Sequence, residues 1–299
     1  MSFHEGELLV QERAGVLADA GRVGRFLRTT VAPAAREFLA TRRFVVLTAE
    51  NADEQVWVTI LAGPPGFLEV SETGTTLNIA AELRSDDPVT SAIHAGASVG
   101  LVAIDFAARR RTRVNGTVQS VDKSIAIDVR EAFGNCPKYI QAYQPAPDGP
   151  TLTTPARSGG QLDAYQRGWI ERAETFFLGT LHPKVGADAS HRGGAPGFVR
   201  VTGLRELAWG DYPGNKMFNS LGNAAVHPPA GMLFVDPETG STLQLSGHLQ
   251  IDWSANAAAE IPGAERVVRF CIDQVVETSG PIPLRWARPT PSRSNPPAR

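Results

Sequence analysis

The sequence lacks several features that would directly indicate the class of protein to which it belongs. Its two cysteines, Cys136 and Cys271, are too few for a disulfide framework or a four-thiolate metal site. Its 29 lysine and arginine residues nearly balance 31 aspartate and glutamate residues, and the net charge of -2 gives no basic field for nucleic acid or an anionic membrane. Apolar runs such as residues 44–47 fall far short of the ~20 residues that cross a bilayer. We therefore expect a small molecule as partner.

Other signals are also missing. The start of the chain is acidic where a signal peptide carries positive charge, so we expect a cytoplasmic protein. The six histidines show no metal-ligand spacing, and we expect no metal site. There is no phosphate-binding loop, no serine nucleophile elbow, and no glycine motif of a built-in nicotinamide domain.

What is present is an ordinary globular composition, with 42% hydrophobic and 20% charged residues. The 29 glycines and 22 prolines indicate many turns, as in a β-rich fold with short strands.

One offset links short motifs in the two halves of the chain. Pro65-Gly66-Phe67 recurs as Pro196-Gly197-Phe198, an offset of 196 − 65 = 131. The run from Gly100 to Asp105 recurs from Gly231 to Asp236, and Gly116 recurs as Gly247, at the same offset. Short glycine and proline motifs agree by chance, but one shared offset for all of them indicates a tandem duplication.

The composition also suggests domain boundaries. Residues 144–160 are rich in Pro, Gly and Thr and cannot bury a core, which predicts a linker. We expect a first split barrel with an N-terminal helical segment over 1–143, and a second barrel over 161–287. Residues 288–299 lack apolar periodicity and are expected to form a disordered tail.

Within each half the pattern predicts a helix, strands, a second helix and further strands. In the first half we expect helices from Pro33 and from the N-cap Asp87, and strands over 44–49, 55–61, 67–70, 76–81, 100–106, 112–121 and 125–132. The predicted fold class is mainly β, a tandem duplication of a six-stranded barrel with a few helices.

Four stretches of the sequence resemble the pyridoxamine-5′-phosphate-oxidase-like proteins, in a branch whose members have a duplicated barrel. They are residues 4–8, 133–141, 190–199 and 212–223. The resemblance implies an FMN-binding split barrel, with the flavin bound between two barrels. It therefore also implies an intrachain pseudo-dimer or a homodimer of chains.

Two of these stretches carry groups that suit a flavin phosphate. In the second half, Gly214 permits close backbone approach, Lys216 brings positive charge, and a helix beginning near Asn215 would favour an anion. Arg192 can pair with phosphate or donate to a flavin carbonyl. The alternative for the stretch with Lys216 is a surface turn followed by an ordinary amphipathic helix, and for Arg192 it is a hairpin in which the arginine is solvated. The candidate cofactor-binding residues are Ser190, His191, Arg192, Gly193, Tyr212, Asn215, Lys216, Ser220, Lys138 and Tyr139.

The duplication provides an internal comparison. The offset places Leu61 opposite Arg192, and puts Asp86 and Asp87 beside the equivalent of the phosphate site. Like charge repels a phosphate, so we expect one flavin site per chain, built mainly on the second barrel.

Residues near the end of the first half are further candidates. The resemblance makes the segment with Lys138 and Tyr139 a lid over the flavin. Cys136 has two interpretations, a buried small hydrophobe or a thiol activated by Lys138. For Arg109, Arg110, Arg111 and Arg113 a solvated turn is favoured over phosphate capture.

The sequence thus predicts an FMN-dependent oxidoreductase acting on an unidentified small molecule, with no catalytic residue named. The alternative is a non-catalytic protein that binds or carries a flavin, the deazaflavin F420 or haem.

Overall fold

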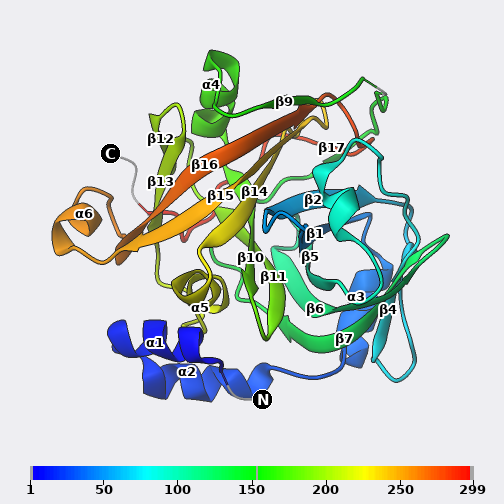
Figure 1. Cartoon of the computed structure of the whole chain (residues 1–299), viewed down its shortest axis with the longest axis horizontal. Helices are drawn as coiled ribbons and strands as arrows, with labels where there is room; N and C mark the ends of the chain where they lie inside the picture. The colour runs from blue at the N-terminus through cyan, green and yellow to red at the C-terminus, as the bar shows by residue number, and fades with distance from the viewer. Residues whose placement is uncertain (1–2, 153, 297–299) are drawn as a thin grey trace.

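The computed structural model describes residues 3–152 and 154–296, which form two large antiparallel sheets (Figure 1). In spatial order, the first sheet contains β2 (Val56–Ala62), β1 (Phe44–Glu50), β5 (Ser98–Asp105), β6 (Arg110–Val121), β7 (Ile125–Gly134), β4 (Thr76–Ile79) and β3 (Leu68–Val70). The second contains β11 (Gly186–Gly193), β10 (Thr175–His182), β14 (Pro229–Val235), β15 (Thr242–Asp252), β16 (Arg266–Thr278), β13 (Glu206–Asp211) and β12 (Val199–Gly203), with β9 (Arg157–Gly159) added beside β16.

The two sheets repeat one strand order. Replacing each strand of the first sheet by the strand 131 or 143 positions later reproduces the second, so the predicted fold class is confirmed. The helices repeat as well: α3 (Pro33–Ala40) is followed 131 positions later by α4 (Ala164–Arg172), and the short helix η2 (Pro88–Ala92) by α5 (Asn219–Val226). The seven strand ranges expected in the first half match the seven strands that each repeat contributes to its sheet, one more than in the six-stranded barrel of the predicted class.

The offset changes once within the repeat. Gly116 pairs with Val129 at a bulge between β6 and β7, and Gly247 pairs with Ile272 at the same bulge between β15 and β16. The glycines are 131 positions apart, whereas their partners are 272 − 129 = 143 apart. The second half therefore carries twelve extra residues here (143 − 131), and this connection contains the short helix α6 (Ala255–Ala259).

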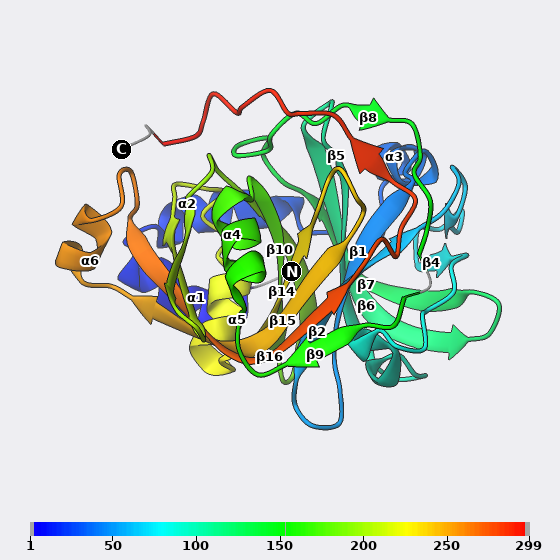
Figure 2. The same ribbon diagram turned by 90° about the horizontal axis from the view of Figure 1, so that it is seen from above.

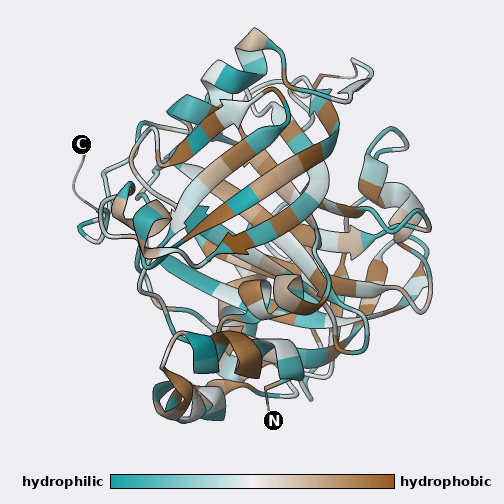
Figure 3. Ribbon diagram, turned by 60° about the vertical axis from the view of Figure 1, so that its left-hand side comes forward, coloured by the Kyte–Doolittle hydropathy of each residue, from teal (hydrophilic) through white to brown (hydrophobic). Residues whose placement is uncertain are grey.

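Each sheet wraps around its own apolar core. In the first half, Leu61 and Leu68 lie on the strands at opposite ends of the sheet order, yet they belong to one buried cluster with Trp57 and Leu101. Apolar and polar residues alternate along the strands of the second sheet (Figure 3), as expected for strands with one face on the core.

A third apolar cluster joins the halves. Phe44 and Val46 on β1 face this cluster, together with Phe177 of β10 and Leu233 of β14. Glycines allow the backbones to come close: an added Cβ on Gly100 would lie 2.5 Å from the Cα of Asp188. Its repeat equivalent Gly231 is equally tight, 2.6 Å from the carbonyl oxygen of Val56. The two halves therefore pack directly against each other, and the intrachain pseudo-dimer or homodimer stays a prediction.

The chain termini pack across the halves. The N-terminal helices α1 (Glu5–Arg13) and α2 (Leu17–Val23), which lead into the short helix η1 (Gly24–Phe26), lie beside α5 of the second half (Figure 1). After β16, the strand β17 (Arg285–Trp286) pairs with β8 (Pro145–Ala146), and the C-terminal segment then runs along one side of the molecule (Figure 2).

The domain boundaries stay a prediction. Within the expected linker, Thr153 lies outside the described residues, and so do residues 297–299 of the expected tail. The described part of that tail makes contacts: Thr290 pairs with Ala142, and Gln141 accepts hydrogen bonds from Ser292 and Asn295. Among the described residues, no helix is long and apolar enough to cross a membrane.

Candidate functional site

A cavity of about 140 Å³ lies between the two halves, and we call it the arginine cavity. The first half contributes two arginines of β6 and residues 135, 136 and 139. The second half contributes the end of β11, residues 209–216 and the start of α5. The cavity therefore exists only where the two repeats meet.

Three arginines distinguish this cavity. Arg111 and Arg113 lie on the same face of β6 because alternate residues of a strand point the same way. Arg192 faces them from β11. Arg113 is paired, since its Nη1 lies 2.9 Å from the carboxylate of the buried Asp188. Within the described chain, no carboxylate oxygen comes within 4.0 Å of Arg111 or Arg192.

The partners of the unpaired arginines are neutral. Arg111 donates to Nδ1 of His191 at 2.8 Å and to the carbonyl oxygen of Cys136 at 3.1 Å. Arg192 donates to the carbonyl oxygen of His191 at 3.3 Å. Burial, followed by the nearby Arg113, lowers the pKa of Arg111 to about 9 and that of Arg192 to about 10. Both remain charged at neutral pH. The carboxylates that line the cavity, Asp211 and Glu265, form ion pairs with Arg266, so neither is the direct partner of Arg111 or Arg192.

The N-terminus of α5 adds to this positive potential. Its N-cap is Phe218 in the left-handed conformation, with φ of 63°, and no side chain caps the helix. The first residues of the helix, Asn219, Ser220 and Leu221, line the cavity. Free N–H groups and the positive end of a helix dipole favour a bound anion.

Strained backbone is concentrated at the same place. Tyr139, Lys216 and Phe218 all have positive φ without being glycine, and all three line the cavity. Such conformations cost energy and persist where the surroundings enforce them, which is frequent at ligand sites.

His191 is a fixed, neutral element of the cavity wall. Because arginine only donates, the bond from Arg111 identifies Nδ1 of His191 as an acceptor, and Nε2 then donates to Thr175 Oγ1 at 3.0 Å. Burial and the neighbouring arginines hold its pKa well below the usual value. The ring therefore orients Arg111 without adding charge.

The structure brings most of the predicted residues together. His191, Arg192, Gly193, Tyr212, Asn215, Lys216, Ser220 and Tyr139 line the cavity.

Ser190 and Lys138 are not among the lining residues. Ser190 lies behind the wall and accepts a hydrogen bond from Ser220 at 3.0 Å, and Lys138 donates to the carbonyl oxygen of Pro213 at 3.4 Å. The helix expected near Asn215 begins instead at Asn219, and Lys216 forms an ion pair with Asp19 of α2.

Arg111 and Arg113 were missed by the sequence interpretation, which favoured a solvated turn for the whole arginine run. Strand alternation separates the run: Arg110 is exposed and stacks over Phe38, whereas Arg111 and Arg113 enter the cavity. A signal was available, because the 131-residue offset places Thr242 and Gln244 opposite these two arginines.

The equivalent position in the first half is filled by the protein itself. A small cavity there is lined by Thr59, Leu61, Asp87 and Thr242, the repeat equivalents of Ser190, Arg192, Phe218 and Arg111. The Asp87 carboxylate accepts hydrogen bonds from Val89 N at 3.0 Å, from Gln244 Nε2 at 3.1 Å and from Thr59. The first half thus places its own carboxylate where the second half leaves room for an anion.

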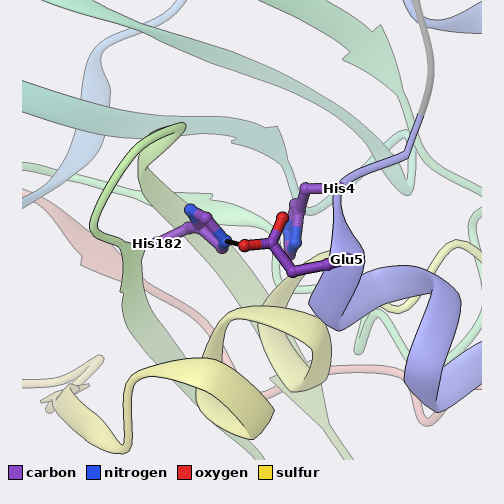
Figure 4. A group of neighbouring side chains, drawn as sticks. All are labelled: His4, Glu5 and His182. Atoms are coloured by element: carbon purple, nitrogen blue, oxygen red, sulfur yellow. Dashed lines mark ion pairs between the residues drawn. The ribbon is translucent and has the colours of Figure 1, made fainter.

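A separate group, His4, Glu5 and His182, is brought together away from the arginine cavity (Figure 4). Nδ1 of His4 accepts from the backbone N–H groups of Gly6 and Glu7, and Nδ1 of His182 accepts from those of Lys184 and Val185. The neutral rings therefore carry their protons on Nε2. These tautomers leave neither imidazole a free lone pair for a metal ion.

No family model matches the sequence, and no curated protein matches it. The structural neighbours include pyridoxamine-phosphate-oxidase-like and FMN-binding proteins, each matching a share of the chain close to one half. A putative pyridoxamine 5′-phosphate oxidase from Lactobacillus delbrueckii is 14% identical with a TM-score of 0.32, covering 38% of this chain and 93% of that one.

Two further neighbours match to a similar extent. An FMN-binding protein from Syntrophomonas wolfei is 10% identical with a TM-score of 0.29, covering 38% of this chain and 83% of that one. An F420 reductase is 14% identical with a TM-score of 0.27, covering 37% of this chain and 93% of that one. Likenesses at this level say nothing about the ligand of this chain.

Proposed function

We propose that the chain binds one FMN in the arginine cavity and is a flavin-dependent oxidoreductase of the pyridoxamine-phosphate-oxidase-like type, acting on a small molecule. The observation that carries the proposal is the cluster of Arg111, Arg113 and Arg192 beside the uncapped start of α5. A phosphate supplies the negative charge that this cluster lacks. The resemblance of the sequence to flavin proteins favours FMN as the carrier of that phosphate.

The polar groups of the cavity fit such a ligand. Three buried atoms of lining residues have no hydrogen-bond partner within the described chain: Nε of Arg111, Nε of Arg113 and Oδ1 of Asn135. Two of the three are donors, as a phosphate requires. The rings of Tyr139 and Tyr212, whose centroids lie 5.6 Å apart at an interplanar angle of 36°, supply an aromatic wall nearby.

The size of the cavity constrains how a flavin enters. About 140 Å³ is less than the 300–1,000 Å³ typical of ligand pockets, so the isoalloxazine ring requires residues 212–216 to move outward. The exposed ion pair between Lys216 and Asp19 closes this side, and Lys216 carries the strained backbone described above. We place the opening movement here.

The roles of the chain's own residues follow from their contacts. Arg111 and Arg192 neutralise the phosphate, and the first N–H groups of α5 donate to it. Arg113 is held by Asp188 and keeps the wall between the halves rigid, while His191 fixes the orientation of Arg111. When bound, the flavin supplies the redox chemistry, passing hydride or electrons through its ring.

Flavin titration tests the proposal, using FMN and riboflavin, which lacks the phosphate. Wild-type protein is expected to bind FMN more tightly than riboflavin, and Arg111→Met or Arg192→Met is expected to weaken FMN about tenfold or more. Riboflavin affinity should stay unchanged in both variants. Arg110→Met is the matched control, because Arg110 lies on the opposite face of the same strand. Absence of flavin binding, or equal binding of both flavins, contradicts the proposal.

A non-catalytic flavin carrier is the second candidate. Both ring nitrogens of His191 are already engaged, so this imidazole is not free to exchange a proton with a substrate. Reduction of the bound flavin by a panel of donors, followed by reoxidation, would establish the oxidoreductase. A flavin that binds tightly but stays oxidised with every donor would establish the carrier. Mass analysis of the co-purified molecule separates FMN from a deazaflavin or haem.

A further inference from the structure

A second and larger cavity, of about 530 Å³, opens between the halves, and we call it the aromatic cavity. Its volume lies in the range typical of small-molecule sites. Six aromatic side chains line it: Phe44, Phe106, Tyr143, Trp169, Phe177 and Trp286. It is separated from the arginine cavity by His191 and Thr175, which are hydrogen bonded to each other.

The cavity originates in an asymmetry between the repeats. The offset pairs Phe44 with Thr175 and Phe106 with Pro237, and all four residues line the cavity. Each pair has a large ring in the first half and a small side chain in the second. The space therefore arises where the second half does not fill its share of the interface.

The aromatic walls are rigid and preformed. Phe44 and Phe106 lie 6.0 Å apart, and Trp286 packs edge-on against both, at 5.5 and 6.0 Å. Tyr143 packs edge-on against Phe106 at 5.4 Å. Phe44, Phe106 and Tyr143 belong to the apolar cluster that joins the halves, and Trp286 packs against it. The aromatic surface is therefore already ordered before a ligand binds.

One carboxylate over this aromatic surface lacks a positive partner. Glu174 is half-buried and accepts a hydrogen bond from the Tyr143 hydroxyl at 3.3 Å. Within residues 3–152 and 154–296 no lysine, arginine or histidine nitrogen lies within 4.0 Å of it. Its repeat equivalent, Arg43, is by contrast paired with Asp148.

The remaining charges at the rim leave an excess of negative charge. Arg172, Arg288 and Glu238 are exposed, and Asp236 uses a carboxylate oxygen to accept from the backbone N–H groups of Glu238 and Thr239. With Glu174 included, three carboxylates face two guanidinium groups.

We propose that the aromatic cavity binds a flat organic cation, an aromatic ring that carries an amine. The ring packs on the side chains of Phe44, Phe106 and Trp286, and the ammonium group donates to Glu174. Aromatic faces and a carboxylate both stabilise a positive charge, and an aromatic ring packs well against the aromatic side chains of the cavity. This proposal does not depend on flavin binding.

Calorimetric titration with three probes of one shape tests the charge preference: naphthylmethylamine, naphthylmethanol and naphthoate. The amine is expected to bind most tightly and the carboxylate most weakly. Glu174→Gln should weaken the amine about tenfold, the loss expected for one hydrogen bond to a charged group, and leave the alcohol unchanged. Equal binding of the amine to wild type and Glu174→Gln, or tighter binding of naphthoate, would overturn the proposal.

Two further variants test the location. Ala173 lines the cavity at the end of α4, so Ala173→Leu should abolish binding of the amine and the alcohol. Ala255→Leu, at an exposed position of α6, should change neither. Adding FMN should leave the amine bound, and Arg192→Met should not alter its affinity. Loss of the amine on addition of FMN would place it in the arginine cavity and would overturn the assignment.

Discussion

Asp87 and Phe218 occupy equivalent positions of the two repeats, but only Asp87 caps the helix that follows it. The Asp87 side chain accepts a hydrogen bond from Val89 N and so caps η2, whereas Phe218 leaves α5 uncapped. The facing residues change with them: Gln244 donates to Asp87 in one half, and its equivalent Arg113 lines the arginine cavity in the other. We infer that the first half contains an internal substitute for the anion proposed for the second half.

Removing this internal carboxylate should affect stability and not ligand binding. Asp87→Ala is expected to lower the free energy of unfolding by about 2 kcal/mol, because a cap is lost and the buried Gln244 amide loses one of its two acceptors, the other being Val58 O. Asp87→Asn keeps an oxygen that caps the helix and should cost less. Urea unfolding measures the first effect, and FMN titration should show wild-type affinity for both variants. An unchanged unfolding midpoint for Asp87→Ala would argue against the role of the cap.

Removing the unpaired guanidinium group of Arg192 should weaken ligand binding and have little effect on stability. Arg192 is close to other guanidinium groups and donates only to a carbonyl oxygen, so Arg192→Met should leave the stability of the ligand-free protein unchanged or slightly raised. Wild-type protein should gain thermal stability when FMN is added, by mass action, and the variant should gain less at the same concentration. Thermal unfolding with and without FMN measures both quantities. A large destabilisation without ligand would show that Arg192 is structural.

Glu7 should make stability depend on pH. It is buried between α1 and α5, where it accepts from His4 N and Asn219 Nδ2, and burial raises its pKa from 4.5 to about 8. The folded protein therefore keeps a proton that the unfolded chain releases above pH 4.5. This contribution to stability is complete below about pH 4.5 and is lost as the pH rises through 8.

Glu7→Gln should remove that dependence. As the pH rises from 4.5 to 8, the free energy of unfolding of wild type should fall relative to that of the variant by up to ~1.4 kcal/mol per pH unit. Above pH 8 the difference between the two proteins should stay constant. The neighbouring His4, whose burial lowers its pKa to about 4, is present in both proteins and cancels in the difference. A difference that is constant with pH would mean that Glu7 is ionised in the folded protein.

The close approach of the halves should tolerate no added atom at Gly100. The Cβ of Gly100→Ala would lie 2.5 Å from the Cα of Asp188, so we expect the free energy of unfolding to fall by about 2–3 kcal/mol. FMN binding should also weaken, because Asp188 forms an ion pair with Arg113 of the arginine cavity. Gly134→Ala is the matched control, because the nearest atom to its Cβ is 4.0 Å away. Chemical unfolding and FMN titration of the two variants check the prediction.

Much of the fold could be predicted because the two halves share short motifs, and because single residues mark the starts of helices and strands. Pro33 marks a helix start, Asp87 is an N-cap, and branched residues mark strands, all as expected from the sequence. The change of offset was not predicted, because the twelve extra residues lie where neither half carries a shared glycine or proline motif. The start of α5 was misplaced by four residues because the left-handed Phe218 has no signature in the sequence.

The arginine cavity was predicted mainly from the side of the second half, and Tyr139 is the one predicted residue of the first half that lines it. Residues 190–193 and 212–220 carry glycines and polar groups that suggest a ligand, whereas the arginines of β6 resemble a solvated turn until strand alternation separates them. The contact between His4 and His182 and the docking of α1 on α5 join residues far apart in sequence, and no local pattern encodes such pairs.

The contact between α1 and α5 also sets an order of events during synthesis. Gly6 packs against Gly222 so closely that an added Cβ would meet its carbonyl oxygen at 2.1 Å, and Glu7 and Asn219 are joined across 212 positions of sequence. Helix α1 therefore leaves the ribosome without its partner, which is made 212 positions later, when much of the second barrel has emerged. Helix α1 is made before α5 and can dock only after it, so the chain must carry this unpaired helix while the residues between them are translated.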